Sequence, residues 1–119
     1  MLDQQSELVR TTLVGSVSLA DLARHARALA TNRLLTVDQL VDGRMGSLRL
    51  SLDETREFAD LMGSLRSVYG SARVAFVPGD AESHRFAERY REMGAGANPA
   101  FALFEDVPSA EVWLVSSRD

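Results

Sequence analysis

The chain has 119 residues, 45% of them hydrophobic and 25% charged, and a formal net charge of −4, which is the size and composition of one ordinary globular domain spanning residues 1–119. It contains neither cysteine nor lysine, which excludes disulfides, cysteine-bound metals, Schiff-base lysines and the lysine of a P-loop. The acidic balance predicts no nucleic-acid partner, and the lack of a long apolar run or a leader-like start predicts no membrane insertion and a cytoplasmic location.

The first strand and the first helix are predicted from alternation and from a capping pair. Apolar and polar residues alternate over residues 7–15, which is typical of a strand, and Gly15 is expected to end it. Ser18 and Asp21 then form a capping pair at the start of a helix. The apolar stripe of this helix is expected to face the core, whereas His25 and its charged neighbours are expected to face water.

A second strand and a second helix follow. Apolar residues over 34–42 predict a strand that ends at a turn, and residues 44–50 are expected to be irregular or briefly extended. Ser51 and Glu54 form a capping box that opens the second helix, and Gly70 is its expected end. Helical spacing predicts one apolar face made of Phe58, Leu61, Met62, Leu65 and Val68.

The last third of the chain has the most regular pattern. Residues 74–77 are wholly apolar, as expected for a parallel strand that is covered by helices on both faces. Asp80 is expected to cap a third helix. Residues 101–104 predict a further strand, and Asp106 is expected to cap a last helix whose inward face includes Trp113. The buried face of the third helix is expected to hold Phe86, Ala87, Tyr90 and Met93.

Strands that alternate with helices of this length predict an α/β fold with a mostly parallel sheet. Several features also resemble one known family: Gly15 before a capped helix, the strand end Gln39-Leu40-Val41-Asp42, the strand 74–77 before a helix, and the terminal pattern Phe104-x-Asp106-x-x-x-Ala110-x-x-Trp113-Leu114. In these the chain resembles the SpoIIAA-like proteins, small bacterial relatives of the STAS domain of anti-sigma factor antagonists. The resemblance implies a SpoIIAA-like/STAS-like sheet of four to five strands with helices, no cofactor, frequent homodimers and a mostly unassigned function.

The chain departs from this family at two places. Family members usually begin with a strand hairpin, whereas only a few residues precede the first predicted strand, so we expect an uncovered sheet edge at residues 7–15. Anti-sigma factor antagonists carry an aspartate and a phosphorylated serine before the second helix. Ser51 matches the serine in position, but Leu50 stands where the acidic residue belongs.

From these features we expect a non-enzymatic interaction or regulatory module that forms a homodimer and binds a protein partner. The partner is expected at the sheet edge, residues 7–15, or on a rim made of Asp42, Arg44, Ser47 and Ser51. Ser47 and Ser51 could accept a phosphate, which the start of a helix would favour. Ser51 can equally be an ordinary helix cap.

A second function class is a carrier of a small apolar or lipid-like molecule. The likeness of the family to lipid-carrying α/β domains suggests it. This function requires an enclosed cavity between the sheet and the helices, lined by residues such as Phe58, Met62, Phe86 and Met93.

A third class is an enzyme or a metal-binding protein. Ligands of open α/β sheets collect at the carboxyl ends of the strands, where Asp42, Asp80 and Asp106 could hold a cation or work with His84. We expect instead that the aspartates cap helices or close a strand and that both histidines face solvent. The sequence therefore predicts no catalytic residues, no cofactor and no metal site.

Overall fold

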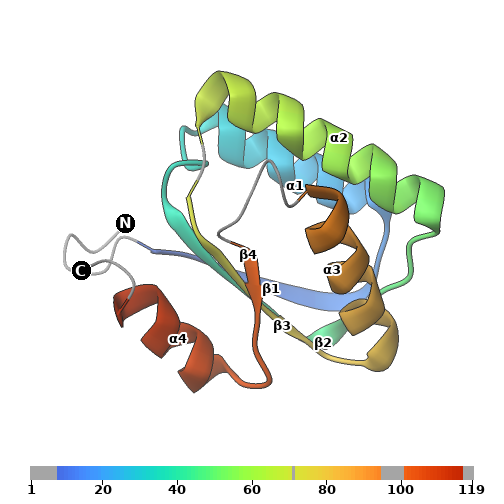
Figure 1. Ribbon diagram of the computed structural model, residues 1–119, viewed down its shortest axis with the longest axis vertical. Helices are drawn as coiled ribbons and strands as arrows, with labels where there is room; N and C mark the ends of the chain where they lie inside the picture. The colour runs from blue at the N-terminus through green and yellow to red at the C-terminus, as the bar shows by residue number, and fades with distance from the viewer. Residues whose placement is uncertain (1–7, 71, 95–100, 117–119) are drawn as a thin grey trace.

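Four parallel strands form one sheet in the order β1-β2-β3-β4 (Figure 1). The computed structural model describes residues 8–70, 72–94 and 101–116. The strands are β1 (Leu8–Val17), β2 (Asp38–Leu48), β3 (Val74–Pro78) and β4 (Phe101–Leu103). The prediction of an α/β fold with a mostly parallel sheet of four to five strands is confirmed.

Three helices cover one face of the sheet and the fourth helix covers part of the other face (Figure 1). Helices α1 (Leu19–Thr31), α2 (Leu52–Tyr69) and α3 (Ala81–Gly94) each connect two neighbouring strands. Because parallel crossovers are right-handed and the strand order runs in one direction, all three connections lie on the same face. Helix α4 (Val107–Ser116) follows the last strand and packs on the opposite face.

The predicted helix caps are present. The Asp21 N–H donates to the Ser18 side chain at 3.2 Å, and the Ser18 N–H donates to the Asp21 carboxylate at 3.0 Å. Ser51 and Glu54 make the same reciprocal pair at the start of α2. These capping boxes satisfy backbone donors that the first turn of a helix leaves unpaired, so they define where α1 and α2 begin.

The predicted boundaries of β1 and β2 are wrong. Gly15 adopts a left-handed conformation (φ 72°) but does not end β1, because pairing with β2 continues through Val17. Residues 34–37 are not part of a strand, because the N–H groups of Leu34 and Val37 donate to carbonyls of the preceding turns. The turn expected after Asp42 is replaced by continued pairing with β1, in which β2 carries one extra residue.

The core has one part on each face of the sheet. Leu48, Phe76, Phe86 and Tyr90 are buried between the sheet and the three covering helices. On the other face, Ala75 and Val77 pack against α4, so both faces of β3 are covered as predicted. Trp113 of α4 lies 5.5 Å from Phe104, between ring centroids. Val68 was expected on the apolar face of α2 but is 73% exposed.

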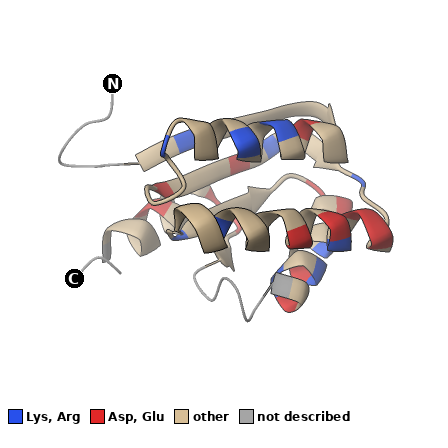
Figure 2. Cartoon of the chain, turned by 90° about the horizontal axis from the view of Figure 1, so that it is seen from above, with Lys and Arg blue, Asp and Glu red and all other residues tan. Residues whose placement is uncertain are grey.

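Charged groups lie mainly on the outer surfaces of the helices. The start of α2 is acidic, with Asp53 and Glu54 in the first turn, where the helix dipole favours negative charge (Figure 2). Within the described residues no helix combines the length and apolar character that crossing a membrane requires.

Candidate functional site

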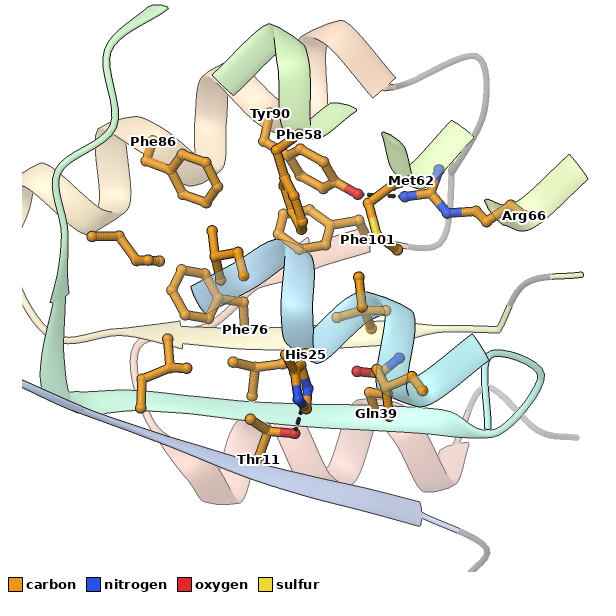
Figure 3. Close-up of a pocket in the computed structure, with 17 residues that line it drawn as sticks. Thr11, His25, Gln39, Phe58, Met62, Arg66, Phe76, Phe86, Tyr90 and Phe101 are labelled. Carbon is orange, nitrogen blue, oxygen red and sulfur yellow. Dashed lines mark hydrogen bonds between the residues drawn. The ribbon is translucent and has the colours of Figure 1, made fainter. Parts of the chain in front are cut away.

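A cavity of about 100 Å³ lies between the sheet and helices α1, α2 and α3 (Figure 3). All four strands contribute to its wall, through residues such as Thr11 of β1, Gln39 of β2, Phe76 of β3 and Phe101 of β4. Alternate residues of a strand point to the same face, so these side chains all turn toward the three covering helices. The cavity therefore occupies the main core of the molecule.

Five aromatic rings form much of the cavity wall. Phe58 comes from α2, Phe86 and Tyr90 from α3, Phe76 from β3 and Phe101 from β4. The centroid of Tyr90 lies 5.4 Å from that of Phe58 and 5.1 Å from that of Phe101, with an edge-to-face arrangement in the second pair. Aromatic rings in contact at these distances stabilise one another, so the wall is a connected apolar surface.

A polar pair lies on the sheet side of this wall. Oγ1 of Thr11 and Nε2 of His25 are hydrogen-bonded at 3.2 Å (Figure 3). Burial lowers the pKa of His25, so the imidazole is neutral at pH 7. The expectation that His25 faces water is wrong. Its position one turn after Leu22 and one turn before Leu29, both of which line the cavity, was the signal that could have placed it.

A second polar pair joins α2 to α3 at another point of the wall. The Arg66 guanidinium donates a hydrogen bond to the Tyr90 hydroxyl (Figure 3). Tyr90 is only 6% exposed, and burial raises the pKa of its hydroxyl while the Arg66 charge opposes that shift. The hydroxyl thus keeps its proton at neutral pH.

Gln39 adds a buried amide to the cavity. It is 6% exposed and lies on β2 between positions that face the same way. Sequence reasoning missed Thr11, Gln39 and Arg66 as site residues, because each is a lone polar residue within an otherwise apolar pattern. For Gln39, the available signal was Val41 two residues further on, since strand alternation places both on one face.

Three of the four residues expected to line a carrier cavity do line it. Phe58, Met62 and Phe86 are in the wall. Met93 is not, because it lies on the other side of α3's contact with α2, in a shallow surface hollow that also includes Arg56 and Ser64. The hollow is open to solvent, so it offers no enclosed apolar space.

The predicted rim residues form separate local interactions. The Arg44 side chain donates to the Asp42 carboxylate at 2.9 Å and 2.8 Å, and this bonding holds the pKa of Asp42 below its usual value. The Ser47 hydroxyl donates to Asp80 at 2.9 Å. Ser51 accepts from the Glu54 N–H at 3.1 Å as the cap of α2. The rim thus pairs Asp42 with Arg44 but does not join them to Ser47 or Ser51.

The aspartates considered for a metal site have structural partners. Asp80 accepts from the Ser83 N–H at 2.8 Å and Asp106 from the Ser109 N–H at 2.7 Å, so both cap helices as predicted. These hydrogen bonds lower the pKa of both carboxyls. His84 Nδ1 lies 3.3 Å from a Glu88 carboxylate oxygen, on the exposed side of α3. Within the described ranges, no three acidic or imidazole side chains are grouped so as to hold a metal ion.

No protein-family model, no curated protein and no solved structure matches this sequence. The likeness to the SpoIIAA-like proteins therefore stays a resemblance, carried by the residues quoted above.

Proposed function

We propose that this chain binds a small, largely apolar molecule in the cavity between the sheet and the three covering helices. The observation that carries the proposal is the cavity itself, about 100 Å³ in volume and walled by apolar and aromatic side chains. Protein interiors are close-packed, and few of their voids exceed the size of a water molecule. An engineered apolar cavity of about 150 Å³ takes up benzene, so a space of this order holds roughly one ring.

The energetics of the void support the same function. In core truncation series, cavity volume lowers stability by about 24 cal/mol per Å³, which gives an upper bound of about 2 kcal/mol for a 100 Å³ space partly open to solvent. One added side chain could fill the space, for example at Ala26, which is 3% exposed and lines the wall. A ligand that fills the void would offset this cost, because it restores the missing contacts.

The test compares two alanines on one helix. Ala26 lines the cavity, whereas Ala30, one turn further along α1 and 4% exposed, does not line it and packs in a cluster with Leu29 and Leu35. We expect Ala26→Leu to fold and to abolish binding of small aromatic probes, measured by thermal shift and by NMR titration. Ala30→Leu should lose about 1–3 kcal/mol by overpacking and still bind. A wild-type protein that binds none of the probes would refute the proposal.

We further propose that the chain acts without catalysis as an interaction module and forms a homodimer through β1. The outer edge of β1 has no partner strand among the described residues, and its residues 11–17 carry no charge. Natural sheet edges are usually blunted by charge, proline or a covering element, so an edge that is neutral over residues 11–17 favours pairing with a second chain. Val14 (65% exposed) and Met45 (70% exposed) add apolar surface beside it.

Light scattering at micromolar concentration tests the dimer. We expect twice the monomer mass for the wild type and a monomer for Val14→Lys, because a lysine on an edge strand opposes strand pairing. Arg44 is exposed on the neighbouring strand, so Arg44→Ala serves as a surface control that keeps the dimer. A monomeric wild type would exclude this mode of association and leave the cavity proposal unaffected.

A further inference from the structure

The Arg66–Tyr90 pair brings two hydrogen-bond donors to one place on the cavity wall. A guanidinium has five N–H donors and no acceptor, and the Tyr90 oxygen accepts only one of them. Because that oxygen accepts from Arg66, the Tyr90 proton is directed elsewhere. Within the described part of the chain, neither the remaining Arg66 donors nor this hydroxyl proton has an acceptor side chain.

Arg66 and Arg73 are similarly buried, but only Arg73 has a carboxylate partner among the described residues. Among the described arginines only Arg66 and Arg73 are partly buried, and all the others are exposed. Arg73 is paired with the Asp38 carboxylate at 2.6 Å. Arg66 has no carboxylate within 4.0 Å among the described residues. Arg66 therefore brings a positive charge to the cavity wall that no carboxylate among the described residues pairs with.

Next to the Arg66–Tyr90 pair, the wall of the cavity is aromatic. Phe58 and Phe101 contact the Tyr90 ring, and Phe76 lies 6.5 Å from Phe101 between centroids. This aromatic surface suits a flat apolar molecule. The Tyr90 ring belongs to it, and the Tyr90 hydroxyl lies at its border with Arg66 (Figure 3). The space therefore fits a molecule with one acceptor-only, negatively charged end and one apolar ring-sized end.

Resting on the proposed function, we propose that the ligand is a small carboxylic acid with an apolar body of about one aromatic ring. The Arg66 guanidinium and the Tyr90 hydroxyl bind its carboxylate, and the aromatic wall binds its body. A carboxylate accepts hydrogen bonds in pairs from a guanidinium, which gives the site both affinity and orientation. The structure thus assigns Arg66 and Tyr90 as the specificity-determining residues of the cavity.

The experiment measures how well the protein distinguishes an acid from its amide. Benzoate and benzamide have the same aromatic ring as their apolar body and nearly the same shape, and only the first is charged. We expect calorimetric titration at pH 7 to show the acid binding about tenfold to a hundredfold more tightly, as hydrogen bonds to charged groups imply. Arg66→Gln should remove this preference, and Tyr90→Phe should reduce it severalfold.

Arg89→Gln is the matched control, because Arg89 is exposed on α3 and does not line the cavity. It should keep the full preference for the acid, and circular dichroism should show that each variant folds. If the wild type binds acid and amide equally, or if Arg66→Gln keeps the preference, the carboxylate proposal is overturned while binding in the cavity stands. If neither probe binds the wild type, both proposals fail.

Discussion

Nε2 of His25 lies 3.2 Å from Oγ1 of Thr11, and this hydrogen bond ties α1 to the edge strand β1 across the wall of the cavity. The imidazole is half-buried there, and burial holds its pKa below the usual value of 6.5. Below that pH the unfolded chain binds a proton that the folded chain does not. The contribution of His25 to the free energy of unfolding should therefore be constant above about pH 6.5. It should fall as the pH is lowered from there toward the folded-state pKa.

Urea unfolding at pH 7.5, 6.5 and 5.5 measures this slope. His25→Gln should flatten it, because the buried imidazole at position 25 is no longer there to bind a proton on unfolding. His84→Gln removes an exposed imidazole of α3 and controls for loss of a surface histidine. An unchanged slope in His25→Gln would contradict the placement of this ring.

Trp113 anchors α4 to the sheet. Its ring contacts Phe104 and lies 5.9 Å below the Arg73 guanidinium. Because the ring is only partly buried, Trp113→Ala should lower the free energy of unfolding by about 2–3 kcal/mol, toward the low end for aromatic truncations. Val112→Ala, on the same helix but 64% exposed, should change it by less than about 0.5 kcal/mol. Equal stabilities for the two variants would mean that α4 does not dock through Trp113.

The Ser51 hydroxyl caps the start of α2 by accepting a hydrogen bond from the Glu54 N–H. Ser51→Ala should lose about 1 kcal/mol in thermal or urea unfolding, since it leaves a first-turn N–H of α2 without its acceptor. Ser64→Ala, at an exposed position within the same helix, should be neutral or slightly stabilising because alanine favours helix. A Ser51→Ala protein as stable as the wild type would show that the capping box contributes nothing measurable.

Gly79 allows two strand ends to approach closely. A Cβ atom there would lie 2.3 Å from the Gly43 carbonyl oxygen, and backbone cannot move aside as a flexible side chain does. Gly79→Ala should therefore cost about 2–3 kcal/mol. Gly63 in α2 has open space around its Cβ direction, so Gly63→Ala should stabilise by up to about 1 kcal/mol. Differential scanning calorimetry of both variants checks the pair, and a Gly79→Ala variant with wild-type stability would contradict this close approach.

Local chemistry was enough to predict the helices and the central strand. Ser18 and Ser51 begin their helices because a side-chain oxygen next to unpaired N–H groups acts over a few residues. The strand Val74–Pro78 could be predicted because a wholly apolar stretch is typical of a parallel strand that is buried on both faces. The end of β2 could not be predicted in this way. Asp42 and Gly43 favour a turn by themselves, but pairing with β1 and β3 continues the strand through them.

The sequence could suggest residues that would line a cavity, but it could not predict that the cavity exists. Periodicity identifies which face of a helix is apolar, and it placed Phe58 and Phe86 correctly toward the sheet. It does not measure whether the side chains of three helices and four strands add up to the volume between them. Arg66 and His25 lie at the border of such faces, where the same pattern allows solvent or interior, and only the packed neighbours decide.

Each strand of this sheet lies beside the strand that precedes it in the sequence. A chain leaving the ribosome can therefore add its strands one by one to a single growing side. The wall of the cavity includes Thr11 from β1 and Phe101 from β4, the first and the last of the four described strands in sequence order. The cavity wall is therefore complete only after all four strands have been synthesised, and a nascent chain that has not yet reached β4 lacks the Phe101 part of it.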